Sequence, residues 1–392
     1  MPPYPTYKLG DVAEIILGQS PESKSYNTKG EGLPFFQGKT EFTDWFPIPN
    51  KWCTEPKKIA EPFDVLLSVR APVGPTNIAK EKCCIGRGLA AIRYADCYKY
   101  VLYYLRSVSK YLESKATGTT FSSISGDTIK NLSIPLPSLP IQHQIVSRIE
   151  SLFAELDKAE AHLRTAQQQL KTYKQAVLNH WLNNEDGKWE TVKLGEVLDR
   201  IEAGKSFRCN EKVPALHEKG IVKISAVTWG EFKEDECKTI TNEELYNPKY
   251  RICEGDLLMS RANTIQLVGN CVLVRNKPAR NIMLSDKVLR LVPNGCIDPK
   301  YTLYSLRTTN CRLQIQTMST GNQDSMRNIG QDRIKKIQIH LPPLPEQQRI
   351  VEEIETRLSQ AEAAEARIAE VLQKTEALRQ SILKKAFSGE LV

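Results

Sequence analysis

The sequence of 392 residues contains no apolar run long enough to span a bilayer. Its start, MPPYPTYKLGDVAEI, lacks the basic segment and following apolar run of a secretory signal. The ten cysteines form no Cys-x-x-Cys pair and no Cys/His spacing typical of a zinc site. We therefore expect a cytoplasmic protein with reduced cysteines. A chain of this length can bury a sufficient core without disulfides or metals.

Motifs of nucleotide binding and catalysis are also lacking. The segment GEGLPFFQGKT at 30–40 resembles a P-loop, but Gly32 stands one position too early, so we predict a strand followed by a loop. NPKY at 247–250 lacks the second proline of the amino-methyltransferase motif and is interpreted as a turn. Glu55 and Lys57, a carboxylate close to a lysine, are only weak evidence for a nuclease site. The histidines, none in a metal-binding spacing, are His143, His162, His180, His217 and His340. The pattern favours a binding protein with no catalytic residue, metal or cofactor of its own.

One long stretch occurs twice. The segment IPLPSLPIQHQIVSRIESLFAELDKAEAHLRTAQQQLKTYKQAVLNHWL at 134–182 returns, without gaps, as IHLPPLPEQQRIVEEIETRLSQAEAAEARIAEVLQKTEALRQSILKKAF at 339–387. Each copy opens with LPxLP, which is incompatible with a helix interior, and then continues for about forty residues without Pro or Gly. The repeat therefore predicts two long helices, each roughly 60 Å long.

Both predicted helices carry a coiled-coil seam, a line of mostly apolar positions that are alternately four and three residues apart. In the first helix the seam positions are Ile145, Ile149, Leu152, Leu156, Ala159, Leu163, Ala166, Leu170, Tyr173 and Val177. In the second they are Ile350, Ile354, Arg357, Ala361, Ala364, Ile368, Val371, Thr375, Leu378 and Ile382. A compact insert between paired helices makes them antiparallel. The alternative is an ordinary helical hairpin within a large core.

The two globular segments are related to each other. Short β-type runs and one helix recur in each, without the rhythm of βαβ units, which indicates an α+β fold. The matching landmarks are KLGDV and KLGEV, Asp64-VLLSVRA and Asp256-LLMSRA, YVLYYLR and YTLYSLR, and the Thr-Gly pairs at 117 and 320. We predict two pseudo-repeated α/β domains held apart by a pair of long antiparallel coiled-coil helices. The predicted boundaries are 1–140, 141–187, 188–345 and 346–392, where 141–187 includes a linker.

The net charge of +8 is distributed unevenly. Lys and Arg outnumber Asp and Glu by 17 to 13 in residues 1–140 and by 25 to 18 in residues 188–345, whereas acidic residues exceed basic ones in both helical segments. Basic domains with a less basic spacer favour binding of a polyanion at two places. A pseudo-two-fold relation between the halves matches DNA half-sites of inverted orientation.

The candidate DNA-binding residues lie in polar, basic loops. Arg and Lys suit guanine edges or phosphates, Asn and Gln can pair with adenine, and Ser and Thr suit phosphates. In the first domain the candidates are Lys24, Lys29, Gln37, Lys39, Thr40, Arg70, Arg87, Thr117, Thr119, Thr120 and Ser122. In the second they are Lys205, Arg208, Lys223, Ser225, Arg261, Lys287, Asn322, Gln323 and Arg327. Each of them could equally be plain solvated surface.

These motifs together resemble the specificity subunit of type I restriction-modification enzymes, over essentially the whole chain. The resemblance rests on LPSLPIQHQIV and LPPLPEQQRIV, KLGDV and KLGEV, and the strands DVLLSVRAPVG and GDLLMSRA; Ile141 stands where Glu is usual. It implies two target recognition domains, each reading one half of a bipartite site in double-stranded DNA. It also implies helices that set the spacer and dock two methyltransferase subunits and, through them, restriction subunits. S-adenosylmethionine, ATP and Mg²⁺ would then bind to those partners.

Three other functions remain open at this point. The chain could be a free-standing bivalent DNA-binding or architectural protein, the specificity subunit of a methyltransferase-only complex, or a coiled-coil scaffold without a role on DNA. Phe153, Trp181 and Phe387 lie off the seam or at its end. They could form a partner surface or cover the chain's own domains.

Overall fold

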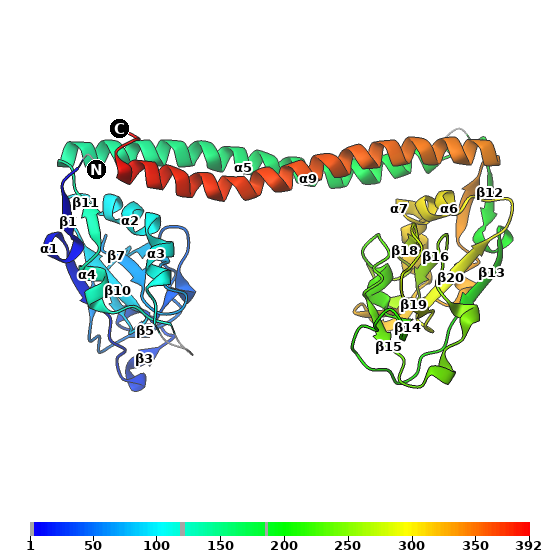
Figure 1. Cartoon of the computed structure of the whole chain (residues 1–392), viewed down its shortest axis with the longest axis horizontal. Helices are drawn as coiled ribbons and strands as arrows, with labels where there is room; N and C mark the ends of the chain where they lie inside the picture. The colour runs from blue at the N-terminus through cyan, green and yellow to red at the C-terminus, as the bar shows by residue number, and fades with distance from the viewer. Residues whose placement is uncertain (1–3, 118–121, 185–186) are drawn as a thin grey trace. The chain divides into compact units, whose positions relative to one another are not determined.

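The computed structural model of the chain describes residues 4–117, 122–184 and 187–392 (Figure 1). It contains two compact units. The first comprises Met1–Arg164 with Ala369–Val392, and the second comprises Thr165–Ile368. Two long helices, α5 (Leu139–Leu182) and α9 (Leu344–Ser388), each contribute to both units. A helix long and apolar enough to cross a membrane is absent from the described part of the chain.

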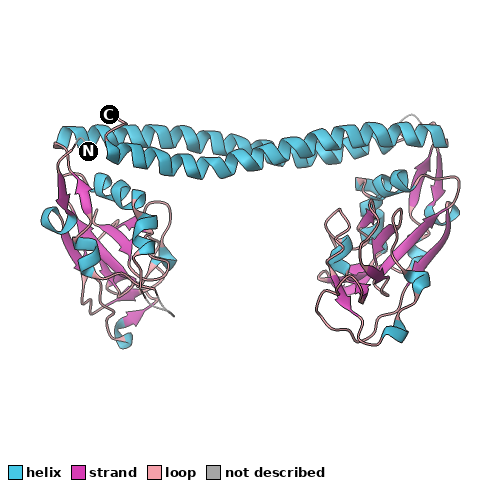
Figure 2. Ribbon diagram, viewed as in Figure 1, coloured by secondary structure: helices cyan, strands magenta, loops and turns pink. Residues whose placement is uncertain are grey.

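The globular part of the first unit contains short strands and helices, shown in Figure 2. In chain order they are β1 (Thr6–Lys8), α1 (Leu9–Val12), β2 (Glu14–Leu17), η1 (Ser23–Ser25), β3 (Tyr26–Asn27), β4 (Leu33–Phe36), η2 (Lys39–Glu41), β5 (Trp52–Cys53), β6 (Ile59–Ala60), β7 (Val65–Ser68), β8 (Thr76–Ile78), β9 (Cys83–Ile85), β10 (Leu89–Arg93), α2 (Tyr98–Ser107), α3 (Ser109–Ser114), α4 (Gly126–Lys130) and β11 (Ser133–Pro135). The central sheet is antiparallel with order β2-β10-β7-β8, and a second sheet has order β3-β5-β4-β9-β6. The strand predicted within GEGLPFFQGKT is confirmed as β4.

The globular part of the second unit repeats this plan. Its elements are β12 (Glu190–Lys193), η3 (Leu194–Glu196), β13 (Leu198–Ala203), β14 (Lys219–Val222), η4 (Ile224–Val227), β15 (Cys237–Thr239), η5 (Glu243–Leu245), η6 (Pro248–Tyr250), β16 (Leu257–Ser260), β17 (Ala262–Asn263), β18 (Cys271–Leu273), β19 (Asn281–Met283), β20 (Val288–Pro293), α6 (Pro299–Leu306), α7 (Thr309–Met318), β21 (Thr320–Gln323), β22 (Met326–Asn328), α8 (Gln331–Ile334) and β23 (Gln338–Leu341). The sheet β13-β20-β16-β18 corresponds strand for strand to β2-β10-β7-β8.

The long helices complete the core of each globular part. In the first unit Phe387 of α9 packs edge-on against Tyr100 and Tyr104 of α2, with ring centroids 5.1 and 5.4 Å apart. Phe153 of α5 packs edge-on against Tyr103 at 5.9 Å. In the second unit Trp181 joins the core cluster as a partly buried residue. These three aromatic side chains therefore cover the chain's own domains, and burial of Phe387, the most buried of them, stabilises the fold by about 1.5–3 kcal/mol.

Within each unit α5 and α9 run antiparallel. Late residues of α9 meet early residues of α5 in the first unit, where Arg379 pairs with Asp157. In the second unit the order is reversed, and Lys174 Nζ lies 2.7 Å from Glu365 Oε2. The fold is therefore α+β, with two related α/β domains joined by a pair of long antiparallel helices.

The predicted seam is wrong at several positions. Ala361 and Thr375 are buried as expected, but Tyr173, Val371 and Leu378 are 43%, 45% and 51% exposed. An α-helix has 3.6 residues per turn, so its buried face drifts away from a strict seven-residue repeat. The apolar side chains that the drift leaves outside are available to other molecules.

The repeated LPxLPxQ motif joins each helix to its domain through a buried glutamine. Gln142 Nε2 donates to the Pro137 carbonyl at 2.9 Å, and its Oε1 accepts from the Tyr94 hydroxyl at 3.2 Å. Gln347 Nε2 donates to the Pro342 carbonyl at 2.8 Å, and its Oε1 accepts from the Asp298 amide at 2.8 Å. Because buried polar groups need partners, these bonds anchor the first turn of both helices.

Candidate nucleic-acid interface

In the first unit three strands of the central sheet meet at one edge, which we call the first edge. Strands β2 and β7 end there and β10 begins there, since Ala90 pairs with Leu17 and Leu89 pairs with Ser68. Gly18 follows β2 and lies so close to the Gly86 backbone that a Cβ there would be 2.2 Å from the Gly86 carbonyl oxygen. The loops at the first edge are therefore packed backbone to backbone.

The first edge gathers candidates that are far apart in sequence. The Gly88 amide donates to the Gln37 carbonyl at 3.1 Å, and the Val69 amide donates to the Gly88 carbonyl at 2.9 Å. These bonds bring Gln37, Arg87 and Arg70 to neighbouring backbone positions, and all three side chains are exposed. Their guanidinium and amide groups are those that recognise guanine and adenine edges.

The loop after α3 joins the first edge through Arg70. The Ala71 amide donates to the Ser122 carbonyl at 2.9 Å, and Arg70 forms an isolated β-bridge with Ser123, which also bridges to Thr117. Buried Ser68 supports this turn by donating to the Arg70 carbonyl at 3.1 Å. The candidates Thr119 and Thr120 lie outside the described residues.

The remaining candidates of the first domain are more dispersed. Lys24 of η1 pairs with neighbouring Glu22 at 2.9 Å, and exposed Lys29 follows β3. Lys39 and Thr40 lie on η2, and Lys39 also lines a groove of about 1180 Å³ beside α2, α5 and α9. The structure therefore brings together Gln37, Arg70, Arg87 and Ser122 more closely than the other members of the set.

The second unit presents an equivalent second edge, where β13 and β16 end and β20 begins. The Arg261 amide donates to the Lys287 carbonyl at 2.8 Å, and the Ile329 amide donates to the Arg261 carbonyl at 2.9 Å. Strand β17 continues from Arg261 and pairs with the hairpin β21–β22. The hairpin carries Asn322 and Gln323, and their exposed amide groups add to the polar side chains at the second edge.

Several candidates of the second domain have partners within the chain. Arg327 donates to the Ser319 hydroxyl at 3.2 Å, to the Gly321 carbonyl at 3.0 Å and to the Ser319 carbonyl at 2.8 Å, so it braces the hairpin. Ser225 donates to Glu236 at 2.6 Å, and Lys223 lies 3.8 Å from Glu211. Lys205 and Arg208, by contrast, are exposed in the segment after β13.

One side chain at the second edge, that of Asp286, is not among the residues predicted from the sequence. Ser206 donates a hydrogen bond to the Asp286 carboxylate, next to Lys205 and Lys287. Residues 285–287 precede β20 as residues 86–88 precede β10, and this strand correspondence is the signal that could have identified it. Within residues 4–117, 122–184 and 187–392, no three His, Cys, Asp or Glu side chains gather in a way that could hold a metal ion.

Comparison with protein families identifies two matching regions. The family model for the type I restriction modification DNA specificity domain matches residues 2–165 and 186–373. The chain is 39% identical over 170 residues to a putative type I restriction enzyme MjaX specificity subunit of Methanocaldococcus jannaschii; that match covers 42% of this chain and only 39% of the relative. It is also 25% identical over 379 residues to the EcoKI specificity subunit of Escherichia coli, with 90% of this chain and 80% of the relative covered.

Solved structures share the fold. A chain from a study of complex assembly and conformational transition of the type I R-M system aligns over 100% of this chain and 99% of its own length, with a TM-score of 0.75 and 21% identity. The HsdS subunit from Thermoanaerobacter tengcongensis aligns over 100% of this chain and 98% of its own, with a TM-score of 0.61 and 20% identity. Since the family model matches most of the sequence, the chain belongs to the type I restriction-modification DNA specificity family.

Proposed function

We propose that this specificity subunit recognises a bipartite sequence in double-stranded DNA, and that each domain reads one half. The observation that carries the proposal is the pair of equivalent sheet edges. Each edge gathers exposed basic and amide side chains from sequence-distant loops, with Arg70 and Arg87 at one and Arg261 and Lys287 at the other. We assign the recognition domains to residues 1–140 and 188–345 and the helical segments to 141–187 and 346–392.

The chemistry of the edges supports reading of bases as well as binding of phosphates. An arginine can donate two hydrogen bonds to guanine, and Gln37, Asn322 or Gln323 can pair with adenine. Lysines such as Lys205 suit the phosphate backbone. In this proposal the rest of the candidate set, including Lys24, Lys29, Lys39, Thr40 and Arg208, contributes mainly to backbone contacts.

The helices would set the spacer between the half-sites and dock partners. Helices α5 and α9 are continuous over 44 and 45 residues, which suits a spacer of defined length. Exposed apolar residues on them, Tyr173, Val371 and Leu378, suit binding of other subunits. We propose that two methyltransferase subunits dock on the helices and that restriction subunits join through them, in the cytoplasm. S-adenosylmethionine would serve methylation on those partners, and ATP with Mg²⁺ would serve restriction.

The experiment that tests the proposal is co-expression of the chain with a methyltransferase subunit from the same genome, followed by long-read mapping of methylated bases in the host DNA. We expect adenine methylation within one bipartite motif. A stable complex without any new motif would contradict sequence recognition. Failure to form a complex, with salt-dependent binding of duplex DNA retained, would favour a free-standing DNA-binding protein.

A further inference from the structure

The two sheet edges carry opposite charges at one equivalent position. Strands β10 and β20 both begin opposite the last residue of the neighbouring strand, since Leu89 pairs with Ser68 and Val288 pairs with Ser260. Two residues before each strand begins, the first edge has Arg87 and the second has Asp286. An acidic side chain here is unexpected, because a carboxylate within about 10 Å of a phosphate repels it.

The Asp286 carboxylate is held in place by the chain itself. The Gly204 amide donates to the Ser285 carbonyl at 3.1 Å, and a Cβ on Gly204 would lie 1.9 Å from the Leu284 carbonyl oxygen, so the segment 204–206 lies directly against this turn. Ser206 donates to Asp286 Oδ1. Among the described residues Oδ2 has no hydrogen-bond partner, and the side chain is half-buried. One acceptor oxygen is therefore oriented and available.

Asp286 and its partner Ser206 each have a basic neighbour in the sequence. Lys205 and Lys287 are adjacent in sequence to Ser206 and Asp286, and both are exposed. The backbone of Arg261 is bonded to Lys287 through the 2.8 Å bond from the Arg261 amide. A carboxylate in a loop that also carries cations able to bind phosphates is suited to a base edge, where cytosine offers its N4 amino group as a donor.

We propose that Asp286 determines specificity in the half-site read by the second domain, by accepting a hydrogen bond from a cytosine amino group. Ser206 is the positioning residue that orients the carboxylate. Arg87 is its counterpart in the first domain and donates to guanine at the corresponding position of the other half-site. This inference rests on the proposed function and adds two residue-to-base assignments to it.

The test uses the full chain in complex with its methyltransferase and a pool of duplexes with randomised sequence, from which bound DNA is sequenced. Wild-type protein should select a bipartite motif with a C·G pair in the second domain's half. Asp286→Asn should reduce discrimination at that one pair by roughly 5- to 150-fold, the range of one good side-chain-to-base contact. Asp286→Arg should shift the preference there to guanine, and Ser206→Ala should weaken discrimination at the same pair by less.

Matched variants separate base recognition from charge. Glu254→Gln removes one exposed negative charge beside the start of β16, at the opposite end of the strand from Arg261, and should leave the motif unchanged. Arg87→Asp should alter the other half only. Asp286→Asn protein that binds all duplexes more tightly but selects the wild-type motif would overturn the assignment while leaving the proposed function intact. A wild-type complex that selects no motif would overturn both.

Discussion

The two recognition domains share a framework and differ in the loops at its edge. In both, an aspartate before a central strand pairs with an arginine of the neighbouring strand: Asp64 with Arg93 and Asp256 with Arg290, each at 2.8 Å. In both, the arginine that closes the YxLYxLR helix donates to a loop carbonyl, Arg106 to Asp44 at 2.9 Å and Arg307 to Gly230 at 2.6 Å. The edges differ, since the second has Asp286 where the first has Arg87. The repeated residues stabilise the fold, whereas the differing residues are free to select DNA sequence.

The largest difference in stability between the two domains should appear when Arg290 of the second domain, or Arg93 of the first, is replaced by alanine. Arg290 is 11% exposed and joins Glu202 and Asp256, whereas Arg93 is 34% exposed. Arg290→Ala should destabilise the second domain by about 3–5 kcal/mol, because buried Glu202 and largely buried Asp256 each lose an ion-pair partner. Arg93→Ala should cost less. Hydrogen exchange of β20 and β10 amides measures both losses.

A control for this comparison is Arg200→Ala. Arg200 also bonds Glu202, at 2.7 Å, but is 60% exposed. Little change in protection of β20 is expected, since exposed ion pairs contribute little. Equal losses for Arg200→Ala and Arg290→Ala would contradict the view that burial decides the effect.

Phe387 and Leu182 lie near the C-terminal ends of the two repeated helices, and truncation of either side chain should destabilise only the domain that it packs against. Phe387 and Leu182 occupy the same position of the repeat, are 9% and 5% exposed, and belong to different core clusters. Phe387→Ala should cost about 3–5 kcal/mol in the first domain and Leu182→Ala about 2–5 kcal/mol in the second. Domain-resolved hydrogen exchange reports the losses. Leu378→Ala on the same helix, 51% exposed, should change stability by less than about 0.5 kcal/mol.

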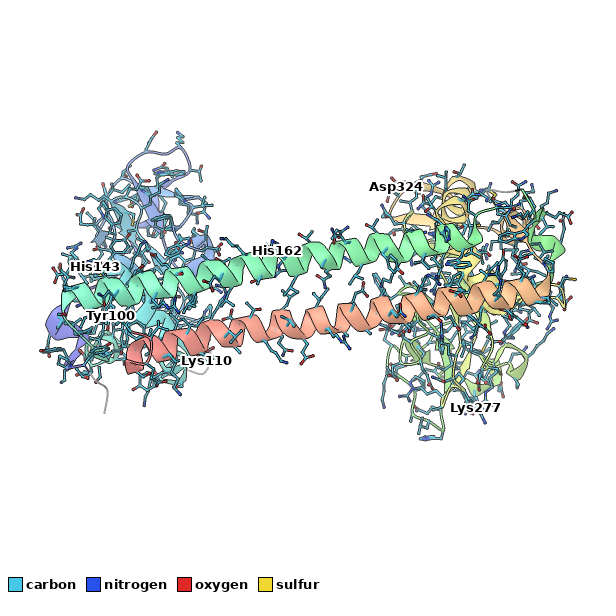
Figure 3. All side chains as sticks on the ribbon, turned by 90° about the horizontal axis from the view of Figure 1, so that it is seen from above. Tyr100, Lys110, His143, His162, Lys277 and Asp324 are labelled. Atoms are coloured by element: carbon cyan, nitrogen blue, oxygen red, sulfur yellow. The ribbon has the colours of Figure 1, made fainter. Side chains whose placement is uncertain are left out.

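The arginines after the central strands should act on separate half-sites. Arg70→Ala and Arg261→Ala should each lower binding of the selected motif by about 1–3 kcal/mol and relax one half only. Competition binding at fixed salt concentration, with duplexes mutated in either half, measures this separation. Lys277→Ala removes an exposed charge between β18 and β19 (Figure 3) and serves as the charge-matched control. Relaxation of both halves by either arginine variant would argue against independent domains.

The smallest predicted difference depends on pH. His340 of β23 lies across from Thr191 and its Nδ1 is 3.1 Å from the Thr191 hydroxyl, whereas Pro135 stands at the corresponding position of β11. Burial lowers the pKa of His340 below its usual value. As the pH falls, His340 therefore takes up a proton at a higher pH in the unfolded chain than in the folded chain. The stability that neutral His340 contributes is fully present above about pH 6.5 and is lost as the pH falls towards the folded pKa.

Hydrogen exchange at pH 7 and pH 5, corrected for intrinsic rates, should thus show loosening of β12–β23 and no change at β1–β11. The variant His340→Asn should remove this dependence. Equal loosening of both strand pairs would show that another group controls the response to acid.

The sequence predicted the large features because they depend on short-range pattern. The two helices follow from LPxLP and from long segments without Pro or Gly, and the relation between the domains follows from repeated strands and the YxLYxLR helices. The seam failed at Val371 and Leu378 because helical drift accumulates over many turns. The candidate loops were chosen by charge and polarity. Sequence could not separate Arg70, which is exposed at an edge, from Arg327, which braces a hairpin.

By itself the sequence determined two basic domains of one type, two long helices and the lack of a recognised catalytic motif. Only the tertiary structure decided which loop residues become neighbours. Gln37, Arg70 and Arg87, or Ser206, Arg261 and Asp286, meet through hydrogen bonds between strands and loops far apart in the chain. Such contacts depend on strand pairing and on the close approach that Gly18 and Gly204 permit, and neither is encoded in local composition.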